Sequence, residues 1–448
     1  MFQKVLIANR GEIAVRIIQA CRDLGIISVA VYSEADREAL HAQIADEAVC
    51  IGPARAAESY LNMDNIISAA LASGCQAIHP GFGFLSENPD FAERITQAGL
   101  AFIGPTAATI RLMGDKSEAK RNAIAAGVPV ALGTDGPLRD FDEAISEAER
   151  IGYPVMLKAA SGGGGKGIRV ALSVKDLKDA YDSAAAEAVA NFGDGRLYME
   201  KYIHNPRHIE VQILGDSLGN VVHLFERECS VQRRHQKLIE ECPSAFVTPE
   251  LREKMTSAAV ALAKRVGYRS AGTIEFLVDN DRNFYFCEMN TRIQVEHPVT
   301  EQVTGVDLVC EQLRIAAGEP ISFKQEDLVM RGHAIECRIN AEDPSRNFAP
   351  CPGTLVSLHL PGGPGVRVDS AAYQGYKIPP FYDSMIGKLI VYGSDRTQAI
   401  DRMRRALAET LFEGVVTGTD YQMHILCSKA FVDANFNVNS IANGDFDQ

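Results

Sequence analysis

No apolar run in this sequence approaches the length of a membrane-spanning helix, and residues 5–8 are too few for the apolar core of a signal peptide. The ten cysteines form no C-x-x-C pair and no zinc-like spacing with histidine, which argues against a zinc motif. The net charge of -13 argues against a nucleic-acid binder or a membrane-surface protein. These absences predict a cytoplasmic protein with reduced thiols.

Two nucleotide-binding fingerprints are missing as well. Residues 5–8, 12–23 and 28–32 predict a strand, an amphipathic helix and a second strand, yet no G-x-G-x-x-G follows the first strand. A Rossmann-like shape therefore does not imply NAD binding here. The Walker pattern fails too, because Ala160 stands where its first glycine belongs and Gly167 where it needs serine or threonine.

The chain has 448 residues, too many for a single hydrophobic core, which predicts two or three domains. With 46% hydrophobic residues, its composition is that of an ordinary globular protein. The loop 77–87 contains HPGFGF and follows a predicted strand, where open α/β sheets bind ligands. A structural turn explains it equally well. The last third predicts short strands and a closing helix over 397–410.

The most informative segment is EMNTRIQVEHP, residues 288–298, which concentrates acidic, amide and guanidinium groups beside apolar flanks. Residues 273–278 and 284–288 predict the strands of a hairpin. The two-residue period places Phe284, Phe286, Glu288 and Asn290 on one face.

If residues 279 and 284 close this hairpin, Glu275 lies opposite Glu288. Neighbouring carboxylates repel unless a cation lies between them, and hard oxygen ligands suit Mg²⁺ or Mn²⁺. The alternative is a solvated hairpin edge. The metal site is the better interpretation, since Arg292, Gln294 and Glu296 continue the polar face where a structural strand would bury apolar residues.

Two further segments predict anion binding. The glycine-rich residues 161–167 join two predicted strands and carry Lys166, with Lys158 just before them, which favours a phosphate-covering flap over a flexible hairpin tip. Residues 226–237 gather Arg233, Arg234, His235 and Lys237 across from Glu226 and Glu228, which indicates an anion site and not a solvated basic turn. Residues 198–203 suit a purine pocket in which Glu200 binds nucleotide, a weak indication when taken alone.

Together these segments resemble biotin carboxylase, the ATP-grasp component of biotin-dependent carboxylases, from residue 5 to about residue 435. The resemblance rests on IANRGEI (7–13), HPGFGFLSEN (79–88), RLMGDK (111–116), the glycine loop (162–167), QRRHQK (232–237), EMNTRIQVEHP (288–298) and YDSM (382–385). It implies an α/β and α+β protein with a Rossmann-like N-terminal domain (1–113), an ATP-grasp domain (114–330, with a mobile lid at about 131–202) and a mixed α+β C-terminal domain (331–448). It also implies a homodimer.

The resemblance also implies a role for each matching residue. ATP would be held by Lys116, Lys158, Gly164, Gly165, Glu200, Lys201, Ile203, His208, Gln232, His235 and Leu277. Two Mg²⁺ or Mn²⁺ ions would be held by Glu275, Glu288 and Asn290. Bicarbonate would be bound by Lys237, Arg292, Gln294, Val295 and Glu296, with Glu296 as the base. Arg338 and Phe82 would lie beside biotin.

Two positions depart from the pattern. Family members often have tyrosine at the position of Phe82, which removes a hydroxyl from the biotin pocket. Arginine also occurs in the family at the position of Lys166, so the charge remains and the bidentate fork is lost.

Three hypotheses remain. The first is the free-standing biotin carboxylase subunit of an acetyl-CoA carboxylase, which works with a biotin carboxyl carrier protein and carboxyltransferase subunits. It is expected because no A-M-K-M acceptor segment is present, and this also suits pyruvate or another acyl-CoA carboxylase. The second is a different ATP-grasp ligase. The third, a silent docking module, has no need for the charges of Lys237, Arg292, Glu296 and Arg338, which are costly to desolvate.

Overall fold

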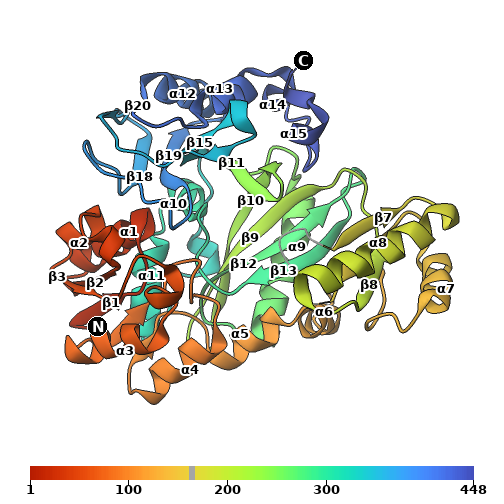
Figure 1. The fold of residues 1–448 in the computed structure, drawn as a ribbon, viewed down its shortest axis with the longest axis horizontal. Helices are drawn as coiled ribbons and strands as arrows, with labels where there is room; N and C mark the ends of the chain where they lie inside the picture. Colours follow the sequence, from red (N-terminus) through yellow and green to blue (C-terminus); the bar gives the residue numbers. More distant parts are fainter. Residues whose placement is uncertain (161–166, 448) are drawn as a thin grey trace.

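The computed structural model describes residues 1–160 and 167–447, and its first third is a parallel sheet in the order β3-β2-β1-β4-β5 (Figure 1). Helices connect the strands, so the predicted βαβ opening is confirmed as part of a Rossmann-like sheet. The elements are β1 (Lys4–Ile7), α1 (Gly11–Asp23), β2 (Ile27–Tyr32), α2 (Leu40–Ile44), β3 (Glu47–Cys50), α3 (Met63–Ala72), β4 (Ala77–His79), α4 (Pro89–Gln97), β5 (Ala101–Phe102) and α5 (Ala107–Gly114).

The loop after β4 is fastened to the turn after β1. Because β1 and β4 are parallel neighbours, their carboxyl ends meet at one edge of the sheet. There the Asn9 amide donates to the carbonyls of Pro80 and Phe82, each at 2.7 Å. Gly81 has φ +63°, and a Cβ on it would lie 2.8 Å from the Asn9 amide nitrogen, so glycine is required at this close approach. The loop that carries Phe82 is therefore held at the edge of the sheet.

The middle of the chain supplies most of an eight-stranded sheet in the order β13-β12-β9-β10-β11-β14-β19-β18. Neighbouring strands in it are antiparallel. The elements of this region are α6 (Lys116–Ala125), β9 (Arg207–Gly215), β10 (Val221–Arg233), β11 (Gln236–Cys242), α9 (Pro249–Arg265), β12 (Ser270–Val278), β13 (Phe284–Asn290), α10 (His297–Thr304) and α11 (Leu308–Ala316).

A separate small sheet, in the order β7-β6-β8, forms the part predicted as a lid. With α7 and α8 it lies at the end of the molecule away from the N-terminal sheet (Figure 1). It has its own core, in which Leu157, Ala184 and Leu197 are buried. The predicted glycine flap at 161–166, with Gly164, Gly165 and Lys166, lies outside the described residues. The elements are α7 (Phe141–Ile151), β6 (Val155–Ala159), β7 (Ile168–Ala171), α8 (Val174–Phe192) and β8 (Leu197–Lys201).

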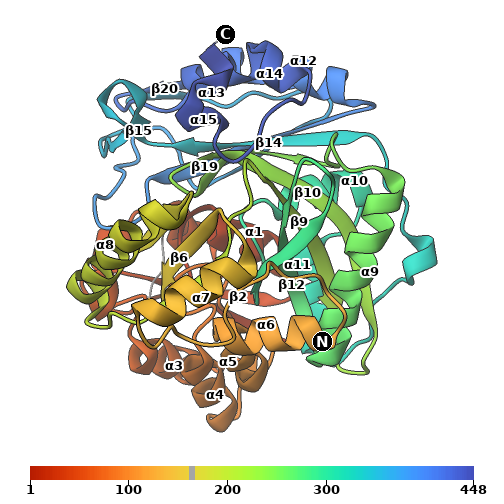
Figure 2. The ribbon, with the colours of Figure 1, turned by 90° about the vertical axis from the view of Figure 1, so that its right-hand side faces the viewer.

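The C-terminal third continues the large sheet. Strand β14 pairs with β11 through Ile239 and Cys337, so the sheet runs across the predicted boundary at 330/331. Figure 2 shows β14 between the C-terminal helices and strands β9 and β10. The elements are β14 (His333–Asn340), β15 (Glu342–Asp343), β16 (Ala349–Pro350), β17 (Ser357–His359), β18 (Val366–Ser370), β19 (Met385–Gly393), α12 (Arg396–Glu409), β20 (Leu411–Glu413), α13 (Thr419–Cys427), α14 (Lys429–Val432) and α15 (Ser440–Asn443).

Helix α12 confirms the closing helix predicted over 397–410. Across residues 1–160 and 167–447, none of the helices combines the length and apolar character that a membrane crossing requires.

Candidate active site

The β12–β13 hairpin brings Glu275 and Glu288 opposite each other, as predicted. The route differs from the prediction. Val278 pairs with Phe284, so the hairpin closes one residue earlier on β12 than predicted, and a register shift between Glu275 and Phe276 then restores the expected pair. Such a shift is a β-bulge, in which one strand carries an extra residue.

This bulge corrects the predicted face. Phe284, Phe286 and Met289 pack in the core, whereas Glu288 is exposed. The prediction that Phe284, Phe286, Glu288 and Asn290 share one face is therefore wrong, because the extra residue reverses the alternation between Phe286 and Glu288. The bulge moves Glu288 and Asn290 away from the aromatic core, to the side where Glu275 lies.

The three predicted metal ligands are together at this point. The Asn290 amide donates to Glu275 Oε1 at 2.9 Å. Burial and the nearby Glu275 carboxylate raise the pKa of Glu288, although part of its side chain meets solvent. Two facing carboxylates that repel each other, with an amide beside them, are an oxygen donor set that fits Mg²⁺ or Mn²⁺.

Lys237, on β11, is the centre of the acidic cluster. Its amine donates to Glu210 Oε2 at 2.6 Å, Glu275 Oε1 at 2.9 Å and Glu296 Oε1 at 2.6 Å. Burial disfavours the charged amine, but the three carboxylates outweigh it and raise the pKa of Lys237 well above its ordinary value. Lys237 therefore stays protonated and holds three acidic side chains around one point.

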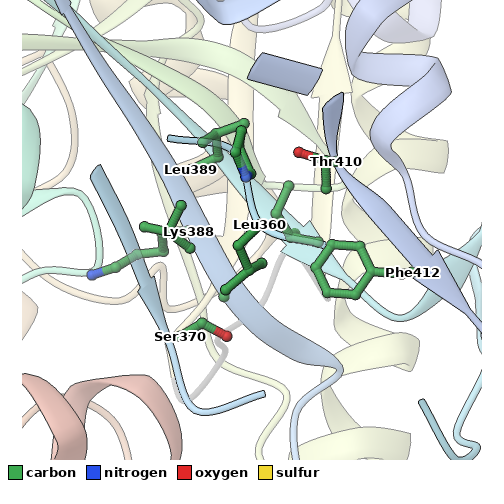
Figure 3. A pocket seen from close by; sticks show the side chains of 10 residues that line it. Leu360, Ser370, Lys388, Leu389, Thr410 and Phe412 are labelled. Carbon is green, nitrogen blue, oxygen red and sulfur yellow. The ribbon is translucent and has the colours of Figure 1, made fainter. Parts of the chain in front are cut away.

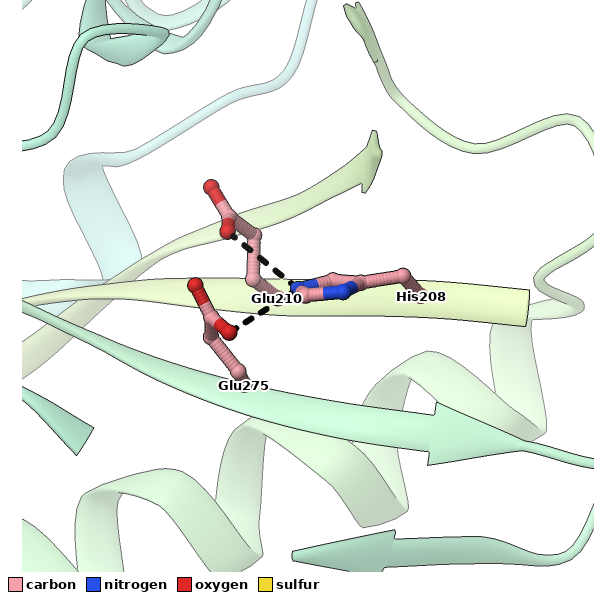
Figure 4. A group of neighbouring side chains, drawn as sticks. All are labelled: His208, Glu210 and Glu275. Carbon is pink, nitrogen blue, oxygen red and sulfur yellow. Dashed lines mark ion pairs between the residues drawn. The ribbon is translucent and has the colours of Figure 1, made fainter. Parts of the chain in front are cut away.

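His208 lies against the same carboxylates from β9. Its Nε2 is 3.1 Å from Glu275 Oε2 and 3.9 Å from Glu210 Oε2 (Figure 4). Burial opposes a charge on the imidazole, yet Glu275 raises the pKa of His208 above its ordinary value. Strand β9 thus presents His208 and Glu210 side by side, as the two-residue alternation predicts.

Glu296 lies between two cations. It is fully buried, its Oε1 accepts from Lys237, and its Oε2 accepts from Arg338 Nη2 at 2.9 Å. Burial opposes ionisation, but Lys237, Arg338 and Arg227 lower the pKa of Glu296 well below its ordinary value. Glu296 is also the residue before α10, where the helix dipole favours a negative charge. The side chain is therefore an ionised carboxylate at neutral pH.

Arg338 and Arg292 approach from two other parts of the chain. Arg338, on β14, also donates to Glu240 Oε1 at 2.6 Å. Arg292 donates to Glu87 Oε2 at 2.8 Å and to Asn290 Oδ1 at 3.1 Å. Gln294 donates to Glu275 Oε1 at 3.1 Å. The N-terminal, middle and C-terminal regions thus each contribute a side chain to one charged network.

The residues predicted for ATP lie along two sheets. In the lid, Lys158 pairs with Glu200, and Lys201 donates to the carbonyls of Gly152 and Tyr153, both at 2.9 Å. In the large sheet, Leu277 pairs with His208 and Gln232 with Lys237. Lys116 begins α6 within electrostatic range of Glu288, His235 lies in the β10–β11 turn, and Ile203 follows β8. Gly164 and Gly165 fall outside the described residues.

The predicted anion site at residues 226–237 is wrong in its geometry. Glu226 pairs with Arg252 and Glu228 with Arg207, so neither acid faces the basic turn. Arg234 and His235 are exposed, and Arg233 donates to Asn347. Lys237 is the member of this cluster that points into the charged network, because it lies on β11, beyond the turn.

Phe82 lies at the edge of the network. Its ring packs against the hydrophobic cluster that contains Ile13 and Ile17 of α1, and the Lys388 amine lies 5.9 Å from the ring centroid. Ring packing is therefore present without the hydroxyl that tyrosine would add.

Sequence reasoning missed several members of the network. Arg227 is fully buried and donates to Glu210 Oε1 at 2.6 Å. Glu240 accepts from Arg338, and burial raises the pKa of Glu240 to about 7. Glu87 anchors Arg292. The alternation of polar residues on β9 had pointed to Glu210, whereas Arg227, Glu240 and Glu87 come from separate strands and a loop.

Family models match nearly the whole chain. Residues 1–110 match the biotin carboxylase N-terminal domain, residues 115–324 the ATP-binding domain of the carbamoyl-phosphate synthase L chain, and residues 336–443 the biotin carboxylase C-terminal domain. Biotin carboxylase 1 of Bacillus subtilis is 55% identical over 446 residues, which cover 99% of each chain. A pyruvate carboxylase subunit of Methanothermobacter thermautotrophicus is 56% identical over 431 residues, 96% of this chain and 88% of that one.

Solved structures agree. The biotin carboxylase of Campylobacter jejuni in a β-γ-ATP complex superimposes with a TM-score of 0.95 at 49% identity and covers 99% of both chains. The biotin carboxylase domain dimer of the Hydrogenobacter thermophilus 2-oxoglutarate carboxylase, with MgADP, ADP and bicarbonate, gives 0.94 at 52% identity, covering 100% of this chain and 99% of that one. With the fold and sequence alike over their full length, the chain belongs to the biotin carboxylase family of ATP-grasp carbon–nitrogen ligases, which carboxylate biotin with the use of ATP.

Proposed function

We propose that this chain performs the first half-reaction of acetyl-CoA carboxylase in fatty-acid synthesis, the carboxylation of carrier-bound biotin by bicarbonate through carboxyphosphate. The observation that carries the proposal is Glu296, a buried carboxylate held between the cations Lys237 and Arg338. Bicarbonate must lose its proton as it attacks the γ-phosphate of ATP, so an ionised base beside fixed positive charge is the group that this step needs.

The bicarbonate pocket would be formed by Lys237, Arg292, Gln294, Val295 and Glu296. In the protein alone, Lys237 donates all three of its hydrogen bonds to carboxylates. Bicarbonate would take one of these bonds. Turning the amine toward bicarbonate weakens its hold on Glu296 and makes that carboxylate a stronger base. Proton transfer to a placed base of this kind contributes about 10²–10⁴-fold to the rate.

The nucleotide would be bound by the residues between the lid and the large sheet. Lys116, Lys158 and His208 would face the phosphates, and Glu200, Lys201, Ile203, Gln232, His235 and Leu277 the rest of ATP, with Gly164 and Gly165 above it. Glu275, Glu288 and Asn290 would hold two Mg²⁺ or Mn²⁺ ions, whose charge offsets that of the phosphates when they are bound. Closure of the lid would exclude water from carboxyphosphate.

The second step would use the opposite side of the network. Carboxyphosphate can break down to CO₂ and phosphate, and phosphate is then a reasonable base for N1 of biotin. Arg338 would stabilise the resulting ureido anion by a charged hydrogen bond, with Phe82 packing nearby. The partners would be a biotin carboxyl carrier protein, carboxyltransferase subunits and a second copy of this chain, in the cytoplasm. All ten cysteines are free, which suits that compartment.

A second candidate is the biotin carboxylase subunit of a pyruvate carboxylase or another acyl-CoA carboxylase. This candidate is supported by the 56% identity to the pyruvate carboxylase subunit of Methanothermobacter thermautotrophicus. Acceptor specificity would reside on the transferase. Isolating this chain from its native extract and identifying the transferase that accompanies it separates the two candidates.

The chemistry is tested with Glu296→Ala. Bicarbonate-dependent ATP hydrolysis is expected to fall by about 10²–10⁴-fold, while nucleotide binding measured by calorimetry stays within about twofold. Glu326→Ala, an exposed glutamate paired at 3.9 Å with Lys324, is the control and should behave as wild type. Normal turnover of Glu296→Ala would refute the role assigned to this carboxylate.

A further inference from the structure

Lys388, on β19, is a fully buried lysine at a junction of three parts of the chain. Its amine donates to the carbonyl of Val295 at 2.8 Å. It lies 3.2 Å from Glu12 Oε1 on α1 and 4.0 Å from Asp369 Oδ2 on β18. The N-terminal helix, the segment before α10 and the C-terminal strands therefore converge on one amine.

The amine forms its hydrogen bond with the backbone although carboxylates are near. Neither Glu12 oxygen accepts a hydrogen bond from the described residues, so the 3.2 Å contact between Lys388 and Glu12 is an ion pair. Lys388 is among the residues that line a small apolar pocket with Leu360 and Phe412, and Figure 3 shows its side-chain nitrogen pointing away from both. A buried ammonium is costly, so it persists where charges compensate it and where its donors have a fixed partner. The carboxylates supply the compensation, and the Val295 carbonyl supplies the partner.

The register of the sheet links this lysine to the base. Arg338 and Lys388 are directly opposed on the antiparallel strands β14 and β19. Opposed residues on such strands project from the same face. Arg338 binds the carboxylate of Glu296, and Lys388 binds the carbonyl of the preceding residue. Two adjacent cations therefore hold the same dipeptide, one by its side chain and one by its backbone.

We infer that Lys388 is a positioning residue, which fixes the peptide between Val295 and Glu296 and thereby aims the base. The inference rests on the proposed role of Glu296. Glu296 reaches Lys237 at 2.6 Å and Arg338 at 2.9 Å, so the peptide that carries it has little freedom. A displacement of about 1 Å at such a group can cost about 10²-fold in rate. Lys388 also contacts Glu12 and lies near Phe82, both in the N-terminal region. The orientation of Glu296 therefore depends on the position of the N-terminal region relative to β19.

The first test is Lys388→Met, which keeps the apolar stem. The expected result is a fall of about 10²-fold in kcat for bicarbonate-dependent ATP hydrolysis, with the KM for ATP within about twofold of wild type. Lys324→Met is the control, since this lysine is 78% exposed and should leave both constants unchanged. A kcat within twofold of wild type for Lys388→Met would overturn the inference.

Removal of the amine also takes away the cation that pairs with Glu12 at 3.2 Å, so an effect on folding needs its own variant. In Lys388→Met/Glu12→Gln the excess buried charge is gone. Wild-type thermal stability together with a kcat still about 10²-fold low supports positioning. Recovery of kcat with stability would show that Lys388 serves folding alone, and would overturn the inference.

A double-mutant cycle with Glu296→Asp separates this inference from the proposed function. If Lys388 acts through Glu296, the combined loss is expected to stay within about tenfold of the larger single loss, because both changes misplace one carboxylate. Losses that multiply to about 10⁴-fold would mean independent action and would overturn the inference. Failure of the proposed function gives a different result, namely wild-type turnover in Glu296→Ala itself.

Discussion

Replacing Lys237 with methionine removes the cation from the centre of three buried carboxylates. The side chains of Glu210 and Glu296 are fully buried and that of Glu275 is 6% exposed, so solvent cannot replace the lost amine. Methionine has a similar length and keeps the packing of the stem. The change therefore isolates the charge.

The size of the effect follows from what remains. Breaking a buried ion pair typically costs about 3–5 kcal/mol, because it leaves a charge without compensation. Each carboxylate here keeps at least one other cationic neighbour: Arg227 on Glu210, Arg338 on Glu296 and His208 on Glu275. We therefore expect Lys237→Met to lower the free energy of unfolding at pH 7.5 by about 3 kcal/mol, the lower end of this range.

Urea denaturation followed by circular dichroism at pH 8 and pH 6 measures this loss. In the wild type, the pKa values of Glu275 and Glu296 are below the ordinary value, so both stay ionised over this range. Without Lys237 their folded pKa values rise above those of the unfolded chain, and folding then takes up protons. Lowering the pH therefore stabilises the variant, and its deficit should shrink at pH 6. A deficit below about 0.5 kcal/mol, or one that grows at pH 6, would refute this account.

Three further predictions follow from the site and the scaffold. Glu288→Gln should raise the Mg²⁺ concentration needed for half-maximal ATP hydrolysis by at least about tenfold, measured by titrating the metal at saturating ATP. Arg292→Lys loses the guanidinium that donates to Glu87 at 2.8 Å and to Asn290 at 3.1 Å, so the KM for bicarbonate should rise about tenfold while the KM for ATP is unchanged. Thr248 caps α9 by accepting from the Leu251 amide, and Thr248→Ala should lower the free energy of unfolding by about 1 kcal/mol without changing kcat.

Much of the local structure was predictable because it is recorded in short patterns. The two-residue alternation gave the strands that became β9, β12 and β13, and the predicted pair of Glu275 and Glu288 is confirmed. The bulge beside Phe276 was not predictable, since either side of a hairpin can hold an extra residue at little local cost. That residue decides whether Glu288 joins Phe286 in the core or faces Glu275.

The long-range part of the site was harder to find. Lys388 and Arg338 face each other across two strands about fifty residues apart in sequence, and Glu87 reaches Arg292 from the N-terminal domain. Sheet order sets such contacts, and local spacing carries no information about it. The basic turn shows the converse: Arg233, Arg234 and Lys237 are neighbours in sequence, yet the turn sends Lys237 inward and leaves Arg234 exposed.

The pairing of β11 with β14 has a consequence for dissecting the protein. A fragment stopping before residue 331 would leave β11 without its neighbour β14 along residues 239–242. An unprotected sheet border of this kind recruits other chains and promotes aggregation. The ATP-binding half is thus expected to precipitate when expressed alone. The domains that the sequence predicts are therefore not expected to be stable as separate fragments.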